Sequence, residues 1–303
     1  MPGTACGFCS YSALLMAILI VKKEVFIIDT KRKYKVIDCL KSIDIRDNSF
    51  VPSARTRIGG SHEGDLDLGH DCKSIYEYDN FSLLWVKQEP GVDSPFDNYV
   101  CHPSAEEIEF SVYGKCTMRY ADGGGGPLVP GVCAYLPAGL PHGNSHQELD
   151  DVILLVFYPK PIAEVGRAEH MIDEPYTGGK NHLMVDFFEA PANEIEKGHF
   201  VTTICNGDKL SAAYHRLSPG CSVPDVNFTS HNVDEIVFVL EGNGIATYPD
   251  KTYPLRPHLA FYNPAGCAHK FWNNTGEDLK LLCLYVTGNA ADVTNEERVF
   301  TID

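Results

Sequence analysis

One pattern of histidine, glutamate, glycine and proline occurs twice in this chain and constrains its fold more than any other feature. The offset between the two copies is nearly constant, since Glu107 and Glu235 are 128 positions apart and His142 and His269 are 127 apart. A duplicated domain keeps one offset at all of its landmarks, whereas chance matches do not. The sequence therefore predicts two copies of one structural unit.

Both copies consist of short segments rich in Val, Ile, Leu, Tyr and Phe, separated by turn residues such as Pro90-Gly91 and Pro130-Gly131. Many short strands at this spacing predict a β-sandwich or β-barrel. We predict an all-β protein with few short helices. Its expected parts are an N-terminal extension (1–50), a first domain (51–165), a linker (166–198), a second domain (199–290) and a polar tail (291–303).

Charge and cysteine usage narrow the class of function. The formal net charge of −16 argues against a nucleic-acid partner, because phosphate binding needs clustered Lys and Arg. The apolar run at residues 13–21 is shorter than the span of about 20 residues that crosses a bilayer, so no membrane partner is expected. The 11 scattered cysteines are typical of reduced thiols in a cytoplasmic protein. We expect a cytoplasmic protein that acts on a small molecule.

Each copy contains two histidines and one glutamate that can form a metal site. The sets are His231, Glu235 and His269 in the second half and His102, Glu107 and His142 in the first. Neutral imidazole and carboxylate suit Fe(II), Mn(II), Ni(II) or Zn(II), so the residue types alone do not choose the divalent metal. A solvated strand start or a turn histidine would give the same pattern without a metal.

The spacing within each set makes different demands on the backbone. In a regular strand alternate residues share a face, so His231 and Glu235 would point the same way. His102 and Glu107 are five positions apart, which requires a bulge or a turn to bring both inward. The first set is therefore expected on an interrupted strand.

These residues resemble the two motifs of the cupin superfamily, a family of small jelly-roll β-barrels, and the whole chain resembles a two-domain cupin, or bicupin. The family motifs read G(x)5HxH(x)3,4E(x)6G and G(x)5PxG(x)2H(x)3N. The matching residues are His231, Glu235, Gly242, Pro264, Gly266, His269 and Asn273 in the second half, and His102, Glu107, Gly114, Gly131, Pro137, Gly139 and His142 in the first. The first histidine of HxH is replaced by Thr229 and by Val100.

The resemblance implies a metal-dependent enzyme. Two histidines and one carboxylate resemble the triad that leaves positions on Fe(II) open for substrate and O2. The leading hypothesis is a non-haem iron dioxygenase or other oxygenase with His231, Glu235 and His269 as catalytic ligands. Its substrate would be a small organic molecule, aromatic or carboxylate-bearing, contacted by Tyr214, Arg216 and Trp272. Aromatic residues in a barrel also serve as core, so this role stays open for them.

Three further expectations follow from the resemblance. The alternatives to an oxygenase are a non-redox isomerase, lyase or decarboxylase that uses a divalent metal, and a non-enzymatic ligand-binding bicupin. Residues 137–143 are similar to the histidine-bearing turn of homogentisate dioxygenase-type enzymes, which favours a working site in the first half as well. Pairing through sheet edges would give a homodimer.

Overall fold

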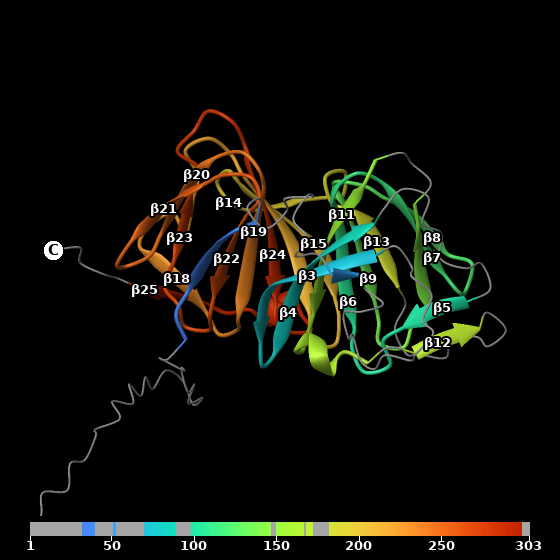
Figure 1. Ribbon diagram of the computed structural model, residues 1–303. Coiled ribbons are helices and arrows are strands. Elements are labelled where there is room, and N and C mark those ends of the chain that lie inside the picture. The colour runs from blue at the N-terminus through green and yellow to red at the C-terminus, as the bar shows by residue number, and fades with distance from the viewer. Residues whose placement is uncertain are drawn as a thin grey trace, which may run out of the picture.

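The computed structural model describes residues 32–39, 51–52, 70–88, 98–146, 150–166, 168–171 and 182–298, and the expectations for residues 1–31 lie outside these ranges. In the described ranges the regular elements are strands and two 3-10 turns, η1 (Ile162–Glu164) and η2 (Ala290–Asp292). Figure 1 shows two β-rich bodies side by side. The all-β prediction is confirmed. No helix in the described part is long and apolar enough to cross a membrane.

The first body, called barrel 1, is built from two sheets. The larger has the order β13 (Leu183–Asp186), β9 (Val132–Leu136), β6 (Glu107–Tyr113), β11 (Val152–Tyr158), β4 (Phe81–Gln88), β3 (His70–Tyr78) and β2 (Val51–Pro52). The smaller has the order β12 (Ala168–Met171), β5 (Asn98–Cys101), β10 (His142–Ser145), β7 (Cys116–Tyr120) and β8 (Gly125–Leu128).

The second body, called barrel 2, repeats this plan. Its larger sheet has the order β1 (Lys35–Asp38), β22 (Leu259–Asn263), β19 (Glu235–Glu241), β24 (Leu279–Tyr285), β16 (Ser211–Leu217), β15 (His199–Asn206) and β14 (Asn193–Glu196). Its smaller sheet has the order β17 (Ser222–Val223), β23 (Lys270–Trp272), β20 (Gly244–Thr247) and β21 (Thr252–Leu255), and β18 (Phe228–His231) pairs with β25 (Asn295–Arg298).

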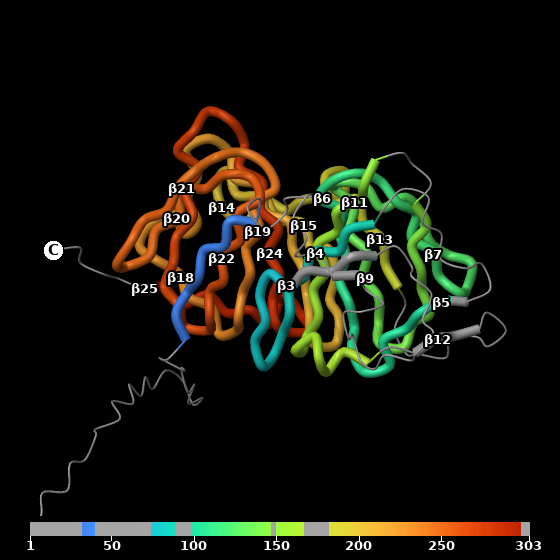
Figure 2. The backbone as a smooth tube through the Cα atoms, in the orientation of Figure 1, coloured from blue at the N-terminus to red at the C-terminus, as the bar shows by residue number. Residues whose placement is uncertain are grey.

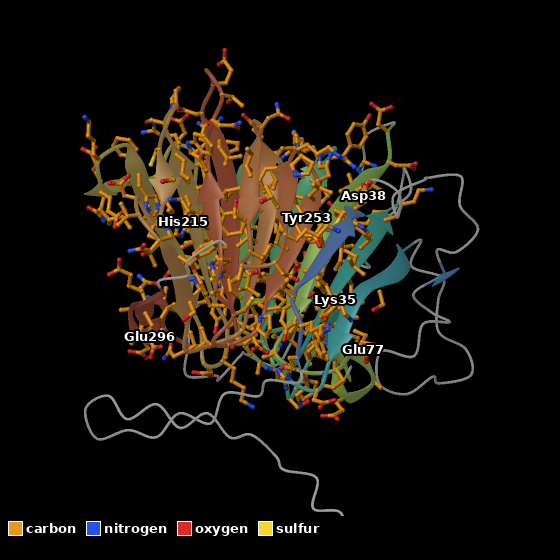
Figure 3. The ribbon with its side chains drawn as sticks, turned by 90° about the vertical axis from the view of Figure 1, so that its left-hand side faces the viewer. Lys35, Asp38, Glu77, His215, Tyr253 and Glu296 are labelled. Atoms are coloured by element: carbon orange, nitrogen blue, oxygen red, sulfur yellow. The ribbon has the colours of Figure 1, made fainter. Side chains whose placement is uncertain are left out.

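The two larger sheets correspond strand for strand. One edge strand of each comes from the segment that precedes the other barrel in the sequence. The early strand β1 pairs antiparallel with β22 of barrel 2, where Figure 2 shows it as a blue tube against the orange barrel. Strand β13, which precedes barrel 2 in the sequence, pairs with β9 of barrel 1. Figure 3 shows Lys35 and Asp38 at the two ends of β1. The exchange is therefore reciprocal.

The expected extension, linker and tail all contain strands. Strands β12, β13 and β14 lie in the expected linker, β1 lies in the expected extension, and β25 lies in the expected tail. All four residues of β14 are exposed, and β25 is also largely exposed. Such edge strands lack the apolar alternation by which strands are recognised in a sequence. The domain limits themselves stay a prediction.

Three hydrophobic cores hold the molecule together. One fills barrel 1 and one fills barrel 2, each with side chains from both of its sheets. The third contains side chains from both barrels, including Trp85 and Phe110 from barrel 1 and Phe238 and Tyr262 from barrel 2. The larger sheets are thus apolar on both faces, one toward the barrel interior and one toward the other barrel.

A buried acid from each barrel is hydrogen-bonded to the other barrel. Glu106 accepts hydrogen bonds from the backbone amides of Asp208, Lys209 and Leu210, in the turn between β15 and β16, and from the hydroxyl of Tyr135. This carboxylate is 3% exposed. Because a buried carboxylate needs several donors, the contact ties barrel 1 to this one turn of barrel 2.

Asp234 makes the corresponding contacts from barrel 2. Its side chain accepts hydrogen bonds from Asn80, in the turn between β3 and β4, from Tyr262 and from Arg32. Glu106 and Asp234 are 128 positions apart and each directly precedes the glutamate of a candidate metal set. The interface thus follows the same repeat as the two sites.

Two glycines that follow β6 and β19 predict a measurable stability effect. Gly114 and Gly242 have φ of +76° and +83°, and a Cβ at either would collide with the carbonyl oxygen of Asp151 or Asp278. We expect alanine at either position to lower the free energy of unfolding by about 1–3 kcal/mol in urea titrations. Gly276→Ala is the control, since nothing lies within 4 Å of its Cβ position. Equal effects for all three would contradict this interpretation.

Candidate metal centres

His231, Glu235 and His269 converge inside barrel 2. His231 ends β18, Glu235 begins β19, and His269 directly precedes β23. The distance from Glu235 Oε2 is 3.5 Å to His231 Nε2 and 3.3 Å to His269 Nε2. All three ligand atoms lie within 4.8 Å of one another. His231 and Glu235 lie on different strands, so their approach comes from the break at residues 232–234 and not from one regular strand.

The turn formed by each PxG motif positions the second histidine of the set near the first. The amide of Gly266 donates to the carbonyl oxygen of His231 at 2.7 Å, and the amide of Gly139 donates to that of His102 at 2.8 Å. Both glycines have positive φ, 77° and 79°. One hydrogen bond therefore connects the backbone of the two histidines' segments in both barrels.

The hydrogen bonds of the imidazoles favour a cation between these side chains. Nδ1 of His269 lies 3.0 Å from the carbonyl oxygen of Cys267, which only accepts, so Nδ1 carries the proton. In the neutral ring Nε2 then presents a lone pair toward the carboxylate of Glu235. A lone pair facing a carboxylate oxygen at this distance is repulsive unless a cation lies between them. The donor set fits a divalent metal, and the carbonyl fixes the ring as in known metal sites.

Barrel 1 assembles the equivalent set in more crowded surroundings. Glu107 Oε2 lies 3.6 Å from His102 Nε2 and 3.5 Å from His142 Nε2. The residues between His102 and Glu107 form a turn, as the sequence spacing requires. The hydroxyl of Tyr158 donates to Glu107 at 2.6 Å, and a second buried carboxylate, Glu109, lies two residues further along the same strand. Barrel 2 has Val237 in place of Glu109.

These surroundings shift the pKa values of the two glutamates in opposite directions. Burial and the neighbouring Glu109 carboxylate raise the pKa of Glu107 well above its usual range. Burial also acts to raise the pKa of Glu235, but the histidines around it and the amide of Asn263 hold it below its usual value. Burial lowers the pKa of His269 to about 4. The raised pKa favours the protonated form of Glu107, whereas Glu235 is ionised and His269 is neutral at neutral pH.

This difference predicts that the two sites load metal with different pH dependence. Because the raised pKa of Glu107 favours its protonated form, a metal at barrel 1 competes with that proton, and its affinity should rise by up to about tenfold per pH unit below this pKa. Glu235 and His269 have already lost their protons there, so they contribute little pH dependence to barrel 2. Zn(II) titrations of Glu235→Ala, which leaves the barrel 1 set, and of Glu107→Ala, which leaves the barrel 2 set, would measure this. Equal pH slopes would contradict it.

The barrel 2 set opens into a pocket of about 340 Å3. Its walls include Val201, Ala213, Leu217, Val223, Phe271 and Leu281, and its polar lining includes Thr229, His199, His215 and Tyr285. The ionisable carboxylates that line it are Glu196 and Glu235, and none of the lining residues is Lys or Arg. Thr229, which replaces a histidine of the family motif, lines the pocket beside the three ligands. The site therefore joins a metal-binding set to a mainly apolar cavity.

The three residues expected to contact substrate do not line this pocket. Tyr214 packs against Phe187 and Phe188, with ring centroids 5.2 and 5.4 Å away, in the core between the barrels. Arg216 lies on the same face of β16, 3.1 Å from Asp278. Trp272 is 43% exposed, whereas its neighbour Phe271 points into the pocket. These three assignments need correction, because side chains on a strand alternate between faces.

The alternation instead brings His215 into the pocket, together with His199 from β15. Nε2 of His199 lies 3.0 Å from Nδ1 of His215, and Nε2 of His215 lies 3.5 Å from the hydroxyl oxygen of Tyr285. Burial lowers the pKa of His199 to about 4 and that of His215 to about 3, so both rings are neutral at neutral pH. The pattern of residues in β16 does not indicate which side points into the pocket, since both of its faces are apolar.

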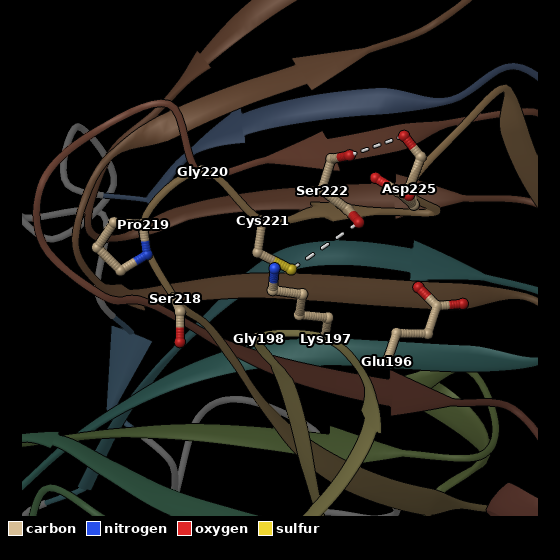
Figure 4. A pocket seen from close by; sticks show the side chains of 9 residues that line it. All are labelled: Glu196, Lys197, Gly198, Ser218, Pro219, Gly220, Cys221, Ser222 and Asp225. Atoms are coloured by element: carbon tan, nitrogen blue, oxygen red, sulfur yellow. Dashed lines mark hydrogen bonds between the residues drawn. The ribbon is translucent and has the colours of Figure 1, made fainter.

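A second and more open pocket of about 720 Å3 lies at the surface next to β14 (Figure 4). It is lined by Glu196, Lys197, Gly198, Ser218, Pro219, Gly220, Cys221, Ser222 and Asp225. Glu196 also lines the barrel 2 pocket. Within the described residues, groups of three ligand atoms close enough to share a metal occur in the two barrel sets only. This surface pocket is therefore not a candidate metal centre.

Comparisons with known proteins agree with the two-barrel fold. Residues 213–285 match the family model of the cupin domain. A search of curated protein sequences found no match. A variant of salicylate 1,2-dioxygenase from Pseudoaminobacter salicylatoxidans, solved in complex with gentisate, is 12% identical with a TM-score of 0.63, covering 88% of this chain and 86% of that one.

Two other solved structures have similar scores. A protein from Pseudomonas aeruginosa described as glyoxylate-induced is 14% identical, with a TM-score of 0.59 and coverage of 89% of this chain and 91% of that one. A variant of oxalate decarboxylase from Bacillus subtilis is 14% identical, with a TM-score of 0.55 and coverage of 77% and 76%. Two of these three neighbours are thus enzymes with different activities, and at such identity the likeness concerns the fold. Residues 213–285 thus match a cupin domain, and the fold of the described chain is similar to that of these solved structures.

Proposed function

We propose that this protein is a metal-dependent enzyme whose reaction centre is the barrel 2 set of His231, Glu235 and His269. The observation that carries the proposal is the opening of this set into the 340 Å3 pocket. Three protein ligands leave coordination positions free, and the pocket gives a small molecule access to them. Glu235 is ionised and His269 is neutral, which are the protonation states that a divalent metal requires.

The more specific proposal is a non-haem Fe(II) oxygenase that acts on a small organic substrate and O2. When bound, Fe(II) would supply the redox chemistry that the side chains of this chain lack. His231, Glu235 and His269 would hold the ion, while the apolar walls would exclude water and position the substrate. No Lys or Arg lines the pocket, so a carboxylate on the substrate could find an opposite charge only at the metal.

Anaerobic reconstitution with Fe(II), followed by O2-uptake measurements with a panel of small aromatic and enolic compounds, tests this proposal. Substrate-dependent O2 uptake that is lost in His269→Ala is the expected result. Turnover with Zn(II) or Mn(II) and no O2 demand would instead indicate a non-redox lyase, isomerase or decarboxylase. A protein that retains no metal after reconstitution would overturn both alternatives and leave a ligand-binding role.

A further inference from the structure

The barrel 2 pocket contains a second polar group that the metal set does not use. His199 begins β15 and His215 lies on β16, where the register pairs His215 with Val201 and His199 with Leu217. The two rings are therefore diagonal neighbours across the strands, with centroids 5.1 Å apart. Figure 3 labels His215 on its strand. Both imidazoles line the pocket in a wall that is otherwise largely apolar.

The hydrogen bonds of this pair leave one atom unused. His199 Nε2 and His215 Nδ1 lie 3.0 Å apart, so one of the two rings donates its N–H to the other. His199 is 2% exposed, and its Nδ1 is buried with no hydrogen-bond partner among the described residues. A buried polar atom without a partner is costly, at about 1–3 kcal/mol. The ring of His199 lines the pocket, so a ligand there would lie next to it.

The pair is continuous with the surroundings of the metal set. His215 Nε2 lies 3.5 Å from the hydroxyl oxygen of Tyr285, and Tyr285 pairs in register with Glu235 on the adjacent strand. Tyr285 corresponds to Tyr158 of barrel 1, 127 positions earlier. Barrel 1 has no imidazole at the position of His215, because its matching strand β4 presents Val86 there. The imidazole pair is thus a feature of barrel 2.

The charge of the lining limits what the pair can recognise. Glu196 and Glu235 are carboxylates, and no Lys or Arg lines the pocket, so the metal would be the only cation able to balance an additional anion there. Burying an ionised group without an opposite charge is strongly unfavourable. A substrate with a free carboxylate directed at this wall would meet neutral imidazoles and apolar side chains only.

We infer that the His199–His215 pair is the substrate-recognition element of the barrel 2 pocket, and that it selects a small uncharged molecule with an apolar body. One oxygen of this molecule would face the metal set, and a second hydrogen-bonding group would contact the imidazole pair. The inference rests on the proposed reaction centre for the orientation of the molecule. It does not depend on which metal is bound.

Two matched probes test this inference on the full chain loaded with Zn(II), which binds the same donor types without redox chemistry. Catechol and salicylate are both single rings with two adjacent oxygen groups, but salicylate carries a carboxylate at neutral pH. We expect catechol to bind at least about tenfold more tightly, a difference of about 1.4 kcal/mol. Binding of salicylate as tight as that of catechol would overturn the inference.

Substitutions of His199 and His215 then test whether these two residues contact the bound probe. His215→Leu and His199→Leu should each weaken catechol binding by about tenfold, as expected for the loss of one buried hydrogen bond, whereas His215→Gln should stay within about threefold of the wild type. His182→Leu, in barrel 1, is the control for loss of a histidine. Catechol binding that is unchanged in both leucine variants would also overturn the inference. If a leucine variant does not fold, the probe comparison in the wild type still decides.

Elemental analysis of the same samples separates this inference from the proposed function. Zinc content should be unchanged in the His199 and His215 variants, because neither residue belongs to the metal set. A wild-type chain that takes up no zinc would overturn the reaction centre. Titration of the zinc-free chain with the two probes, and with the leucine variants, would then decide the role of the imidazole pair separately.

Discussion

Glu235→Gln is expected to remove the metal from barrel 2 and to lower the turnover by at least about 100-fold, since even substitutions outside the ligand set of a metal site cost about 10- to 100-fold. Glutamine keeps the size of the side chain and the neighbouring hydrogen bonds but removes the charge that lies 3.3–3.5 Å from the two imidazoles. Metal content by elemental analysis and the initial rate of substrate consumption measure the effect in parallel.

The matching substitution in barrel 1 assigns the metal to one barrel or the other. Glu107→Gln should lower the metal content without removing the metal held by His231, Glu235 and His269. His182→Ala, which removes a partly exposed histidine of barrel 1 outside both sets, is the control for non-specific effects. If Glu235→Gln keeps its metal and its turnover while Glu107→Gln loses both, the reaction centre lies in barrel 1.

Glu106→Ala is expected to lower the free energy of unfolding by about 3–5 kcal/mol, because each buried donor left without its acceptor costs about 1–3 kcal/mol. The substitution takes away the acceptor of three backbone amides and of the Tyr135 hydroxyl, and these donors stay buried. Urea titrations followed by fluorescence measure the change. Because the barrels share one core, we expect a single transition that moves as a whole.

Two companions make this expectation specific. Asp234→Ala should cause a similar loss, since it removes the reciprocal contact with Asn80 and Tyr262. Glu189→Ala removes an exposed carboxylate and should change the stability by no more than about 0.5 kcal/mol. A Glu106 variant as stable as the Glu189 variant would show that the contact between the barrels contributes nothing to folding.

The repeat offset and the motif spacing predicted the fold and both histidine–glutamate sets, because these depend on residues that recur at fixed positions. The walls of the pocket could not be predicted in the same way. Strand β16 is apolar on both faces, with Ala212 and Tyr214 in the core between the barrels and Ala213 and Leu217 inside barrel 2. Alternation reveals the buried face of a strand only when the other face is polar. His215 was therefore not distinguished from its neighbours.

The edge strands were missed for a related reason. Strand β14 exposes all of its side chains, and β1 becomes part of a sheet only through its pairing with β22, more than 200 residues away in the sequence. No local pattern indicates such pairing. A polar segment of four residues is predicted to be a linker unless its partner strand is known.

The reciprocal exchange of β1 and β13 has a consequence for the history of the protein. Each barrel receives an edge strand from the segment that precedes the other barrel, and each supplies a buried acid to a turn of the other. In a single-barrel ancestor these same contacts would join two identical subunits in a two-fold symmetric dimer, since residue i contacts j and j contacts i. Gene duplication and fusion would then convert a subunit interface into a covalent neighbour. Once joined, the two copies are free to differ, and the pair Glu109 and Val237 records one such divergence beside the metal sets.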